Sequence, residues 1–356
     1  MMPISPSNIF IDRSRVALDN RCKRARFWCN EYKGRGIVPD GSDYALSFGS
    51  ATHEVLAHVN RGERVHDALH LVFPSFRERV QNVLSPQKLE EQWSLLSGLI
   101  HGYVRLILPQ FLEEYEIYSV EGECELEIAP QVTLVATPDL ILRRKSDGTL
   151  WYVEYKTTKL ATGRWVASWS RSIQAMAGAL TVEKSVGEPL AGYIILGLYK
   201  GYDKEGQTRS PFTYWFRDKH GQESPKWKTE AVDVPVWERV GGVARAVEEM
   251  DVDLLANQYP QTPPLFVNRR LVDRWLKQLL IRERQIAAAR GDEAFSDEAL
   301  MDLVFPQNFD ACEPAIGMSC PYRSLCFSPR GEEEPFSQGF KWREPHHVGD
   351  PALEGA

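Results

Sequence analysis

Two apolar segments separated by a turn signal constrain the fold of this chain most strongly. The segments TLVATPDLILRR (133–144) and LWYVEYK (150–156) are β-rich, and Asp147-Gly148 between them is a strong turn signal. Glu154 and Lys156 lie two residues apart on the second predicted strand, so their side chains share one face. Asp139 ends or interrupts the first strand and lies alongside them if the strands pair. The sequence therefore predicts two carboxylates and a lysine at one place.

These residue types in this arrangement indicate metal-assisted hydrolysis. Two converging carboxylates bind a hard cation such as Mg²⁺ or Mn²⁺ through oxygen. A neighbouring lysine can orient or help deprotonate the water that attacks a phosphodiester, while the metal stabilises the developing charge. An aspartate followed by Glu-x-Lys is a weak signal by itself, because Lys–Glu pairs are common on exposed strand faces.

The remaining segments predict helices around a central group of strands, which is an α/β or α+β arrangement. Ser85 is a helix cap and Pro86 a first helical residue, and Gly291 marks a helix end. We find no internal repeat and no interdomain seam. The expected helices are 44–59, 86–115, 165–184 and 271–290, and the expected strands include SVEGECELEIA (119–129) and GYIILGLYKG (192–201).

Charge and hydropathy exclude some classes of protein. The chain has 356 residues and a net charge of −7, which excludes a protein that coats nucleic acid through bulk positive charge. A groove that is basic only locally remains compatible with this charge, and residues 13–26 carry six basic residues against one acid. The chain lacks an apolar run of membrane-spanning length, and its N-terminus does not resemble a signal peptide. We therefore expect a cytoplasmic protein without membrane contact.

The cysteines indicate a metal centre more than a disulfide framework, because the expected compartment is reducing. Cys312, Cys320 and Cys326 fall within the fifteen residues CEPAIGMSCPYRSLC, and Cys22 and Cys29 lie near the start of the chain. Thiolates favour zinc or iron–sulfur centres, whereas isolated cysteines are often small buried hydrophobic residues. We prefer the second interpretation for Cys124, which lies in a strand-like segment.

The chain resembles the PD-(D/E)XK nuclease superfamily, in particular its RecB-like branch, which includes CRISPR-adaptation nucleases and phage exonucleases. The matching text is PD at 138–139, EYK at 154–156, and an upstream helix LSFGSATHEVL with Gly49 and His53. Downstream, SIQAMAGAL supplies Gln174 of the Gln-x-x-x-Tyr motif, but Gly178 stands where the tyrosine belongs. The resemblance implies an α/β restriction-endonuclease-like core with a central mixed sheet flanked by helices. It implies Mg²⁺ or Mn²⁺ held by His53, Asp139 and Glu154, and it implies catalytic roles for Asp139, Glu154, Lys156 and Gln174.

The same branch implies a role for the cysteines. Its iron–sulfur members have one cysteine before the nuclease core and three after it, and a structural [4Fe–4S] cluster joins the two ends. By resemblance the ligands here are Cys22, Cys312, Cys320 and Cys326, with Cys29 as the substitute for Cys22 and zinc as the alternative metal. The implied organisation is a single domain over 1–330, with a cluster segment at 8–35, a core at about 44–200, a C-terminal part at 262–328, and a mostly disordered tail at 331–356.

The function implied by the resemblance is a metal-dependent DNA nuclease, specifically an exonuclease acting on single-stranded or duplex ends. Recombination, repair or phage replication proteins are the implied partners, and Arg24 and Arg26 are candidates for contacts to DNA phosphates. Two alternatives stay open at this point. One is a non-catalytic DNA-binding or assembly module on the same fold, and the other is a zinc protein without nuclease activity.

Overall fold

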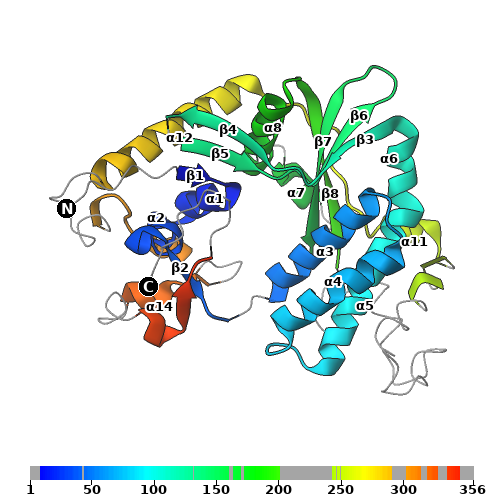
Figure 1. Cartoon of the computed structure of the whole chain (residues 1–356), viewed down its shortest axis with the longest axis horizontal. Helices are drawn as coiled ribbons and strands as arrows, with labels where there is room; N and C mark the ends of the chain where they lie inside the picture. The colour runs from blue at the N-terminus through cyan, green and yellow to red at the C-terminus, as the bar shows by residue number, and fades with distance from the viewer. Residues whose placement is uncertain are drawn as a thin grey trace.

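The protein has a mixed α/β architecture in which small sheets lie between layers of helices (Figure 1). The predicted fold class, a central mixed sheet flanked by helices, is confirmed. The computed structural model describes residues 9–41, 44–130, 132–159, 163–169, 172–200, 243–245, 247–248, 250–290, 302–313, 319–327 and 335–344.

A helical layer covers one side of the central sheet. It consists of α3 (Tyr44–Asn60), α4 (Val65–Val80), α5 (Pro86–Gly102), the π-helical turn η3 (Tyr103–Ile107) and α6 (Leu108–Glu114). The predicted start of α5 is confirmed, because the Ser85 side chain accepts a hydrogen bond from the Lys88 N–H at 3.3 Å and Pro86 is the first helical residue. The predicted helix at 44–59 is confirmed as α3, which buries Ala51, Val55 and Val59.

Contrary to the expectation from the sequence, the stretch Pro86–Glu114 is long and apolar enough to cross a membrane by length and composition alone. However, 56% of the most apolar 18-residue part of this stretch is buried inside the protein. Trp93, Leu96 and Leu99 of α5 are each at most 1% exposed and belong to the core shared with the sheet. This packing is that of an internal helix of the domain.

The central sheet has the strand order β3-β6-β7-β8, in which β3–β6 and β6–β7 are antiparallel and β7–β8 is parallel. Its strands are β3 (Tyr115–Val120), β6 (Leu140–Arg144), β7 (Leu150–Thr158) and β8 (Leu190–Tyr199). The predicted turn between β6 and β7 is confirmed, and Gly148 adopts a φ of 71° there, a conformation that glycine adopts without strain.

A second sheet has the order β1-β5-β4 and consists of β1 (Ile9–Ile11), β5 (Val132–Ala136) and β4 (Cys124–Ala129). The prediction of one strand over 119–129 is wrong, because β3 ends at Val120 and β4 begins at Cys124. The interruption expected at Asp139 divides 133–144 into β5 and β6, and in both segments the two halves join different sheets. Glu121 adopts a φ of 48°, which ends β3. Pro138 has no N–H to donate to a sheet, and it separates β5 from β6.

The two faces of β7 pack against different helices. Trp151, Val153 and Tyr155 belong to the core with α3, α4 and α5, whereas Leu150 and Tyr152 pack with α8 (Ile173–Val186). Two further helices, α7 (Gly163–Trp169) and α12 (Arg269–Arg290), lie on the α8 side. The short helix α11 (Val252–Ala256) lies on the other side, where Leu255 packs into the core with α5 and η3. The predicted helix 271–290 is therefore confirmed as α12, while the predicted helix 165–184 is divided into α7 and α8.

The N- and C-terminal segments form one lobe beside the sheets (Figure 1). Its elements are α1 (Arg13–Arg21), α2 (Lys23–Arg26), η1 (Phe27–Glu31), η2 (Tyr32–Gly34), β2 (Ile37–Pro39), η4 (Phe309–Ala311), α14 (Arg323–Phe327), η5 (Pro335–Gln338) and β9 (Phe340–Trp342). A buried ion pair ties this lobe to α12, since the Arg26 guanidinium binds both carboxylate oxygens of Glu283 at 2.7 and 2.8 Å.

The prediction of a disordered tail over 331–356 is wrong for residues 335–344. There β9 pairs with β2 in antiparallel register, Phe340 is buried, and the Trp342 ring packs on Tyr32 and Phe336. The aromatic residues supply the apolar burial that the glycine, proline and glutamate content of the segment did not suggest. The other residues of the predicted tail lie outside the described residues.

The half-buried His101 near the end of α5 predicts a pH dependence of stability. Burial, with a smaller effect of nearby His66, lowers the pKa of His101 from 6.5 to about 4. The unfolded state therefore takes up this proton first as the pH falls, so stability is lost between about pH 6.5 and 4. We expect His101→Gln to reduce that loss by about 1–3 kcal/mol in urea unfolding series at several pH values. The exposed His70→Gln is the control, and identical pH slopes for wild type and His101→Gln would contradict the prediction.

Candidate active site

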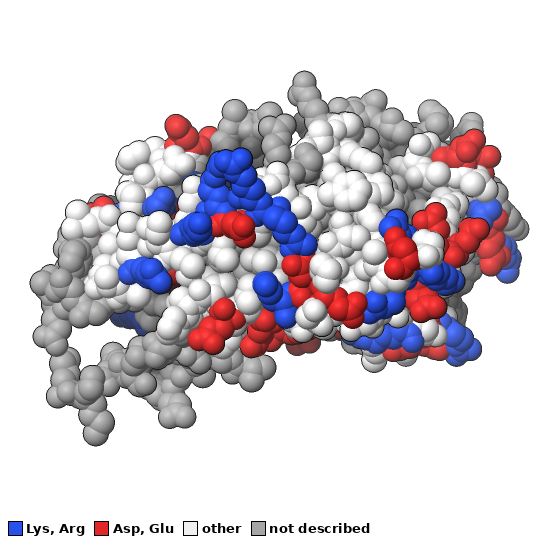
Figure 2. Space-filling model, turned by 90° about the horizontal axis from the view of Figure 1, so that it is seen from above, with Lys and Arg blue, Asp and Glu red and all other residues white. Residues whose placement is uncertain are grey.

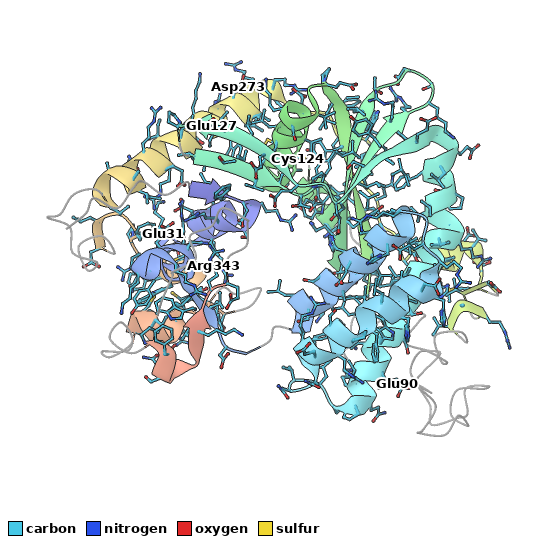
Figure 3. The ribbon with its side chains drawn as sticks, in the orientation of Figure 1. Glu31, Glu90, Cys124, Glu127, Asp273 and Arg343 are labelled. Atoms are coloured by element: carbon cyan, nitrogen blue, oxygen red, sulfur yellow. The ribbon has the colours of Figure 1, made fainter. Side chains whose placement is uncertain are left out.

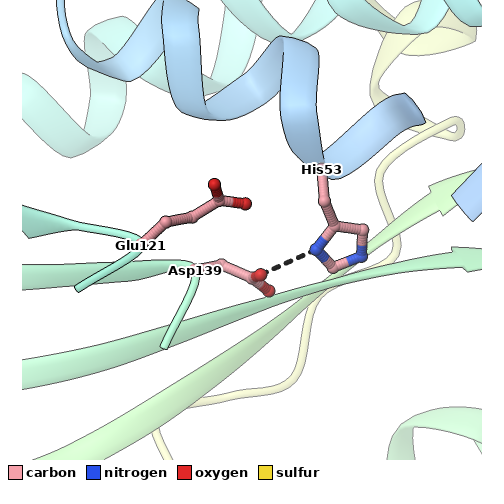
Figure 4. A group of neighbouring side chains, drawn as sticks. All are labelled: His53, Glu121 and Asp139. Carbon is pink, nitrogen blue, oxygen red and sulfur yellow. Dashed lines mark hydrogen bonds and ion pairs between the residues drawn. The ribbon is translucent and has the colours of Figure 1, made fainter. Parts of the chain in front are cut away.

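Asp139 occupies the break between β5 and β6 and is 7% exposed. Its Oδ2 accepts a hydrogen bond from the backbone N–H of Tyr155 on β7 at 2.6 Å. Its Oδ1 lies 2.7 Å from Nδ1 of His53 on α3 (Figure 4). The carboxylate is therefore held from two sides, by the neighbouring strand and by the helical layer.

Glu121, which follows β3, completes a cluster with His53 and Asp139. One ligand atom from each of the three side chains lies within 4.8 Å of the others, and Figure 4 shows the side chains converging. Burial raises the pKa of the Glu121 carboxyl, and the negative charge of Asp139 raises it further. Two carboxylates and one imidazole fit a divalent cation, which would relieve this repulsion. Sequence reasoning missed Glu121, and the only signal was an acid at the end of a strand.

Glu154 and Lys156 point to the same side of β7, and their side chains are in contact. The Glu154 carboxylate also contacts the guanidinium of Arg13 and the hydroxyl of Tyr152. Burial opposes ionisation of Glu154, but the charges of Lys156 and Arg13 outweigh it and hold the pKa of that carboxyl well below its usual value. Glu154 is thus an ionised carboxylate that is only 2% exposed and lines the same cleft as the cluster. The sequence did not suggest its contacts with Arg13 and Tyr152.

A cleft of about 290 Å³ connects these side chains. It is lined by the start of α1, by α3, by the two strand breaks, by β7 and by α8. The lining residues are Asp12, Arg13, Ser14, His53, Glu121, Val135, Ala136, Thr137, Asp139, Tyr152, Glu154, Ala177 and Gly178. A partly buried cleft lined by carboxylates and by the Arg13 guanidinium, with Lys156 in contact with Glu154, suits metal-assisted chemistry on an anion.

A comparison with known protein families identifies the family of this chain. The family model of the PD-(D/E)XK nuclease superfamily matches residues 14–327, which is most of the chain. The chain belongs to the PD-(D/E)XK nuclease superfamily. A search of curated proteins gave no significant match. The mixed sheet flanked by helices is consistent with the restriction-endonuclease-like fold, and superfamily members use divalent metal ions.

Within this superfamily, Gln174 was the remaining expected catalytic residue. It is the second residue of α8, and its side chain lies outside the described residues. Gly178, one turn further along α8, lines the cleft. The helix that carries the expected Gln-x-x-x-Tyr motif therefore borders the candidate site.

The thiols of Cys22, Cys312, Cys320 and Cys326 gather in the lobe formed by the two ends of the chain. Burial, with a smaller effect of neighbouring Cys320 and Cys22, raises the pKa of the Cys326 thiol to about 11. Burial also raises the thiol pKa values of Cys312 and Cys320, and Cys22 contributes to both. The backbone N–H of Cys320 donates to the Cys312 carbonyl at 3.0 Å. A metal ion would bind such thiols as thiolates.

The other two cysteines have different polar neighbours. Cys29 is near Tyr322, and burial raises the pKa of its thiol while the Tyr322 hydroxyl lowers it. Cys124 is buried on β4 and packs with the apolar residues between the sheet and α8 (Figure 3). Cys22 is the N-terminal cysteine whose charge raises the pKa values of Cys312, Cys320 and Cys326.

The prediction that Arg24 and Arg26 contact DNA phosphates is wrong for this structure. Arg24 is 5% exposed and donates to the Phe305 carbonyl and to Asp302. Arg26 is 1% exposed and paired with Glu283. A buried guanidinium requires carboxylate or carbonyl partners. Part of the basic segment 13–26 therefore consists of arginines that bind such partners and hold the lobe together.

Exposed positive charge gathers instead on α12, as Figure 2 shows from that side of the molecule. The helical stripe comprises Arg270, Arg274, Lys277 and Arg284. All four side chains are exposed, and none has a carboxylate within ion-pair distance in the described part of the chain. Other arginines of α12 are paired, Arg269 with Glu183 and Arg282 with Asp19.

The role of Glu121 can be tested by metal binding. We expect Glu121→Gln to lower the affinity for Mn²⁺ at least about 10-fold, because it removes one negative oxygen donor from the cluster. Isothermal titration calorimetry with Mn²⁺ measures this directly. The matched control is Glu127→Gln on the exposed side of β4 (Figure 3), which should bind like wild type. Equal Mn²⁺ affinity of Glu121→Gln and wild type would exclude Glu121 as a ligand.

Proposed function

We propose that this protein is a Mg²⁺- or Mn²⁺-dependent DNA nuclease that hydrolyses phosphodiester bonds. The observation that carries the proposal is that His53, Glu121, Asp139 and Glu154 line one cleft, with Lys156 in contact with Glu154. Membership of the PD-(D/E)XK nuclease superfamily supports the same reaction class.

The proposed roles follow from the contacts of each side chain. His53, Glu121 and Asp139 would hold the ion, and Glu154 beside them would serve as a further acidic ligand. A bound divalent ion activates water and stabilises charge on the scissile phosphate. Asp139 keeps its place because a backbone N–H of β7 anchors it. Lys156, whose side chain is 16% exposed, lies against Glu154 and would position the attacking water.

Gln174 has a separate proposed role. Its position on α8 beside the cleft supports a contact to the DNA backbone or to Lys156. The resemblance to RecB-like nucleases is what assigns it a catalytic part.

DNA is the proposed substrate, and exonuclease action on its ends follows from the RecB-like resemblance. The exposed basic stripe on α12 supports a polyanionic partner, since the rest of the chain is acidic enough to give a net charge of −7. Recombination, repair or phage replication proteins are the proposed partners on the same resemblance. Six free cysteines support a reducing compartment, and we propose the cytoplasm.

Catalysis can be tested with labelled single-stranded, duplex and circular DNA in Mg²⁺, Mn²⁺ or EDTA. We expect Lys156→Ala to lower the cleavage rate by about 10²–10⁴-fold while DNA binding is retained, because the lysine acts on the nucleophile. Asp139→Ala and Glu154→Ala should abolish cleavage, and excess Mn²⁺ should partly restore Glu154→Ala.

The control is Lys184→Ala at an exposed position of α8. Resistance of closed circles to cleavage would support exonuclease action. Cleavage by Lys156→Ala and Glu154→Ala at the wild-type rate would place the site elsewhere.

We also propose that Cys22, Cys312, Cys320 and Cys326 bind a structural [4Fe–4S] cluster, as in the iron–sulfur members of the RecB-like branch. The gathering of these thiols from the two ends of the chain supports it. Four thiolates are also a ligand set for zinc, which is the alternative. In either case the metal would join α1 to the segment around α14.

The cluster proposal predicts a coloured protein after anaerobic purification. We expect bound iron and visible absorption in wild type, and loss of both together with a lower melting temperature in Cys22→Ser and Cys326→Ser. Cys29→Ser is the matched control and should keep its iron. A colourless wild-type protein with stoichiometric zinc would replace the cluster by a zinc site, and a metal-free, stable wild type would reject both.

A further inference from the structure

The hydroxyl of Tyr152 has an unusual position beside the candidate catalytic carboxylate. Tyr152 lies on β7 two residues before Glu154, so both side chains point to the same face. The hydroxyl donates to Oε2 of Glu154, whereas Lys156 and Arg13 contact Oε1. Different groups therefore act on the two oxygens of this carboxylate.

The Tyr152 side chain reaches this position because α8 has no side chain at residue 178. A Cβ atom added to Gly178 would lie 3.1 Å from the Tyr152 hydroxyl oxygen and 3.2 Å from Cε1 of its ring. Such contacts are tighter than ordinary packing, so even alanine would displace the ring. Gly178 and Tyr152 thus fit each other across the interface between α8 and β7, and both line the cleft.

We propose that Tyr152 is a positioning residue that orients the Glu154 carboxylate through its hydroxyl, in the space that Gly178 leaves open. This inference rests on the proposed nuclease function. A buried aromatic ring has little freedom to move, so the hydroxyl holds Oε2 in one direction. The hydroxyl also adds no charge, unlike Lys156 and Arg13, and therefore leaves Glu154 negative for a divalent cation.

The experiment compares Tyr152→Phe with Tyr193→Phe. Tyr193 is paired with Tyr152 in the register of β7 and β8, is equally buried at 2% exposure, and belongs to the same apolar cluster. We expect Tyr152→Phe to weaken Mn²⁺ binding about 10-fold and to lower kcat by a similar factor, with KM for DNA unchanged. Tyr193→Phe should change neither quantity, although both variants lose a tyrosine hydroxyl from the core.

A second variant tests the same geometry from the helix. Gly178→Ala should weaken Mn²⁺ binding in the same direction by displacing the Tyr152 ring, without altering any charged group. The double variant should bind Mn²⁺ no more weakly than the poorer single variant, because both changes act through one hydrogen bond. Thermal unfolding of each variant checks that the fold is retained.

The outcomes separate this inference from the function on which it rests. Wild-type protein that cleaves DNA and binds Mn²⁺, with a folded Tyr152→Phe variant that does both equally well, would overturn the positioning role alone. Additive losses in the double variant would also overturn it. A wild type that neither binds Mn²⁺ nor cleaves DNA would reject the proposed function, and the positioning role with it.

Discussion

The hydrogen bonds of one carboxylate hold the candidate site together. The β6–β7 ladder ends at the pair Leu140–Val153. Asp139, the next residue toward the cleft, lies in the break between β5 and β6 and not in a strand. Asp139 compensates by accepting the Tyr155 N–H through its side chain at 2.6 Å, while its other oxygen meets His53. An unpaired buried N–H is costly, so this bond fixes the carboxylate as well as the strand.

The alternation of side chains along β7 separates the chemistry from the core. Tyr155 points into the core, where its hydroxyl lies 2.8 Å from the Tyr103 hydroxyl and accepts from Asn60 at 3.1 Å. These buried polar contacts tie the strand to α3 and η3. Glu154 and Lys156 point the other way, so these core contacts hold the strand in addition to the Asp139 hydrogen bond and without occupying the site.

Local sequence signals predicted much of the fold because their causes are local. The Ser85 cap of α5 and the Gly148 turn depend on a few neighbouring residues, and both form as predicted. The strand breaks also have local causes, but the sheet that each half-strand joins depends on more distant segments, as in the pairing of β5 with β1. The ordered segment around Phe340 depends on β2, about 300 residues earlier in the chain.

The same division holds for the site. The sequence by itself determined that Asp139, Glu154 and Lys156 share a strand–turn–strand unit, because strand periodicity and a tight turn follow from neighbouring residues. Only the tertiary structure brought Glu121 to His53 and Asp139, directed Arg13 and Tyr152 onto Glu154, and buried Arg24 and Arg26 against acceptors. Residue type gives a side chain its charge and hydrogen-bonding groups, but the partner it meets is set by the packing of segments far apart in the chain.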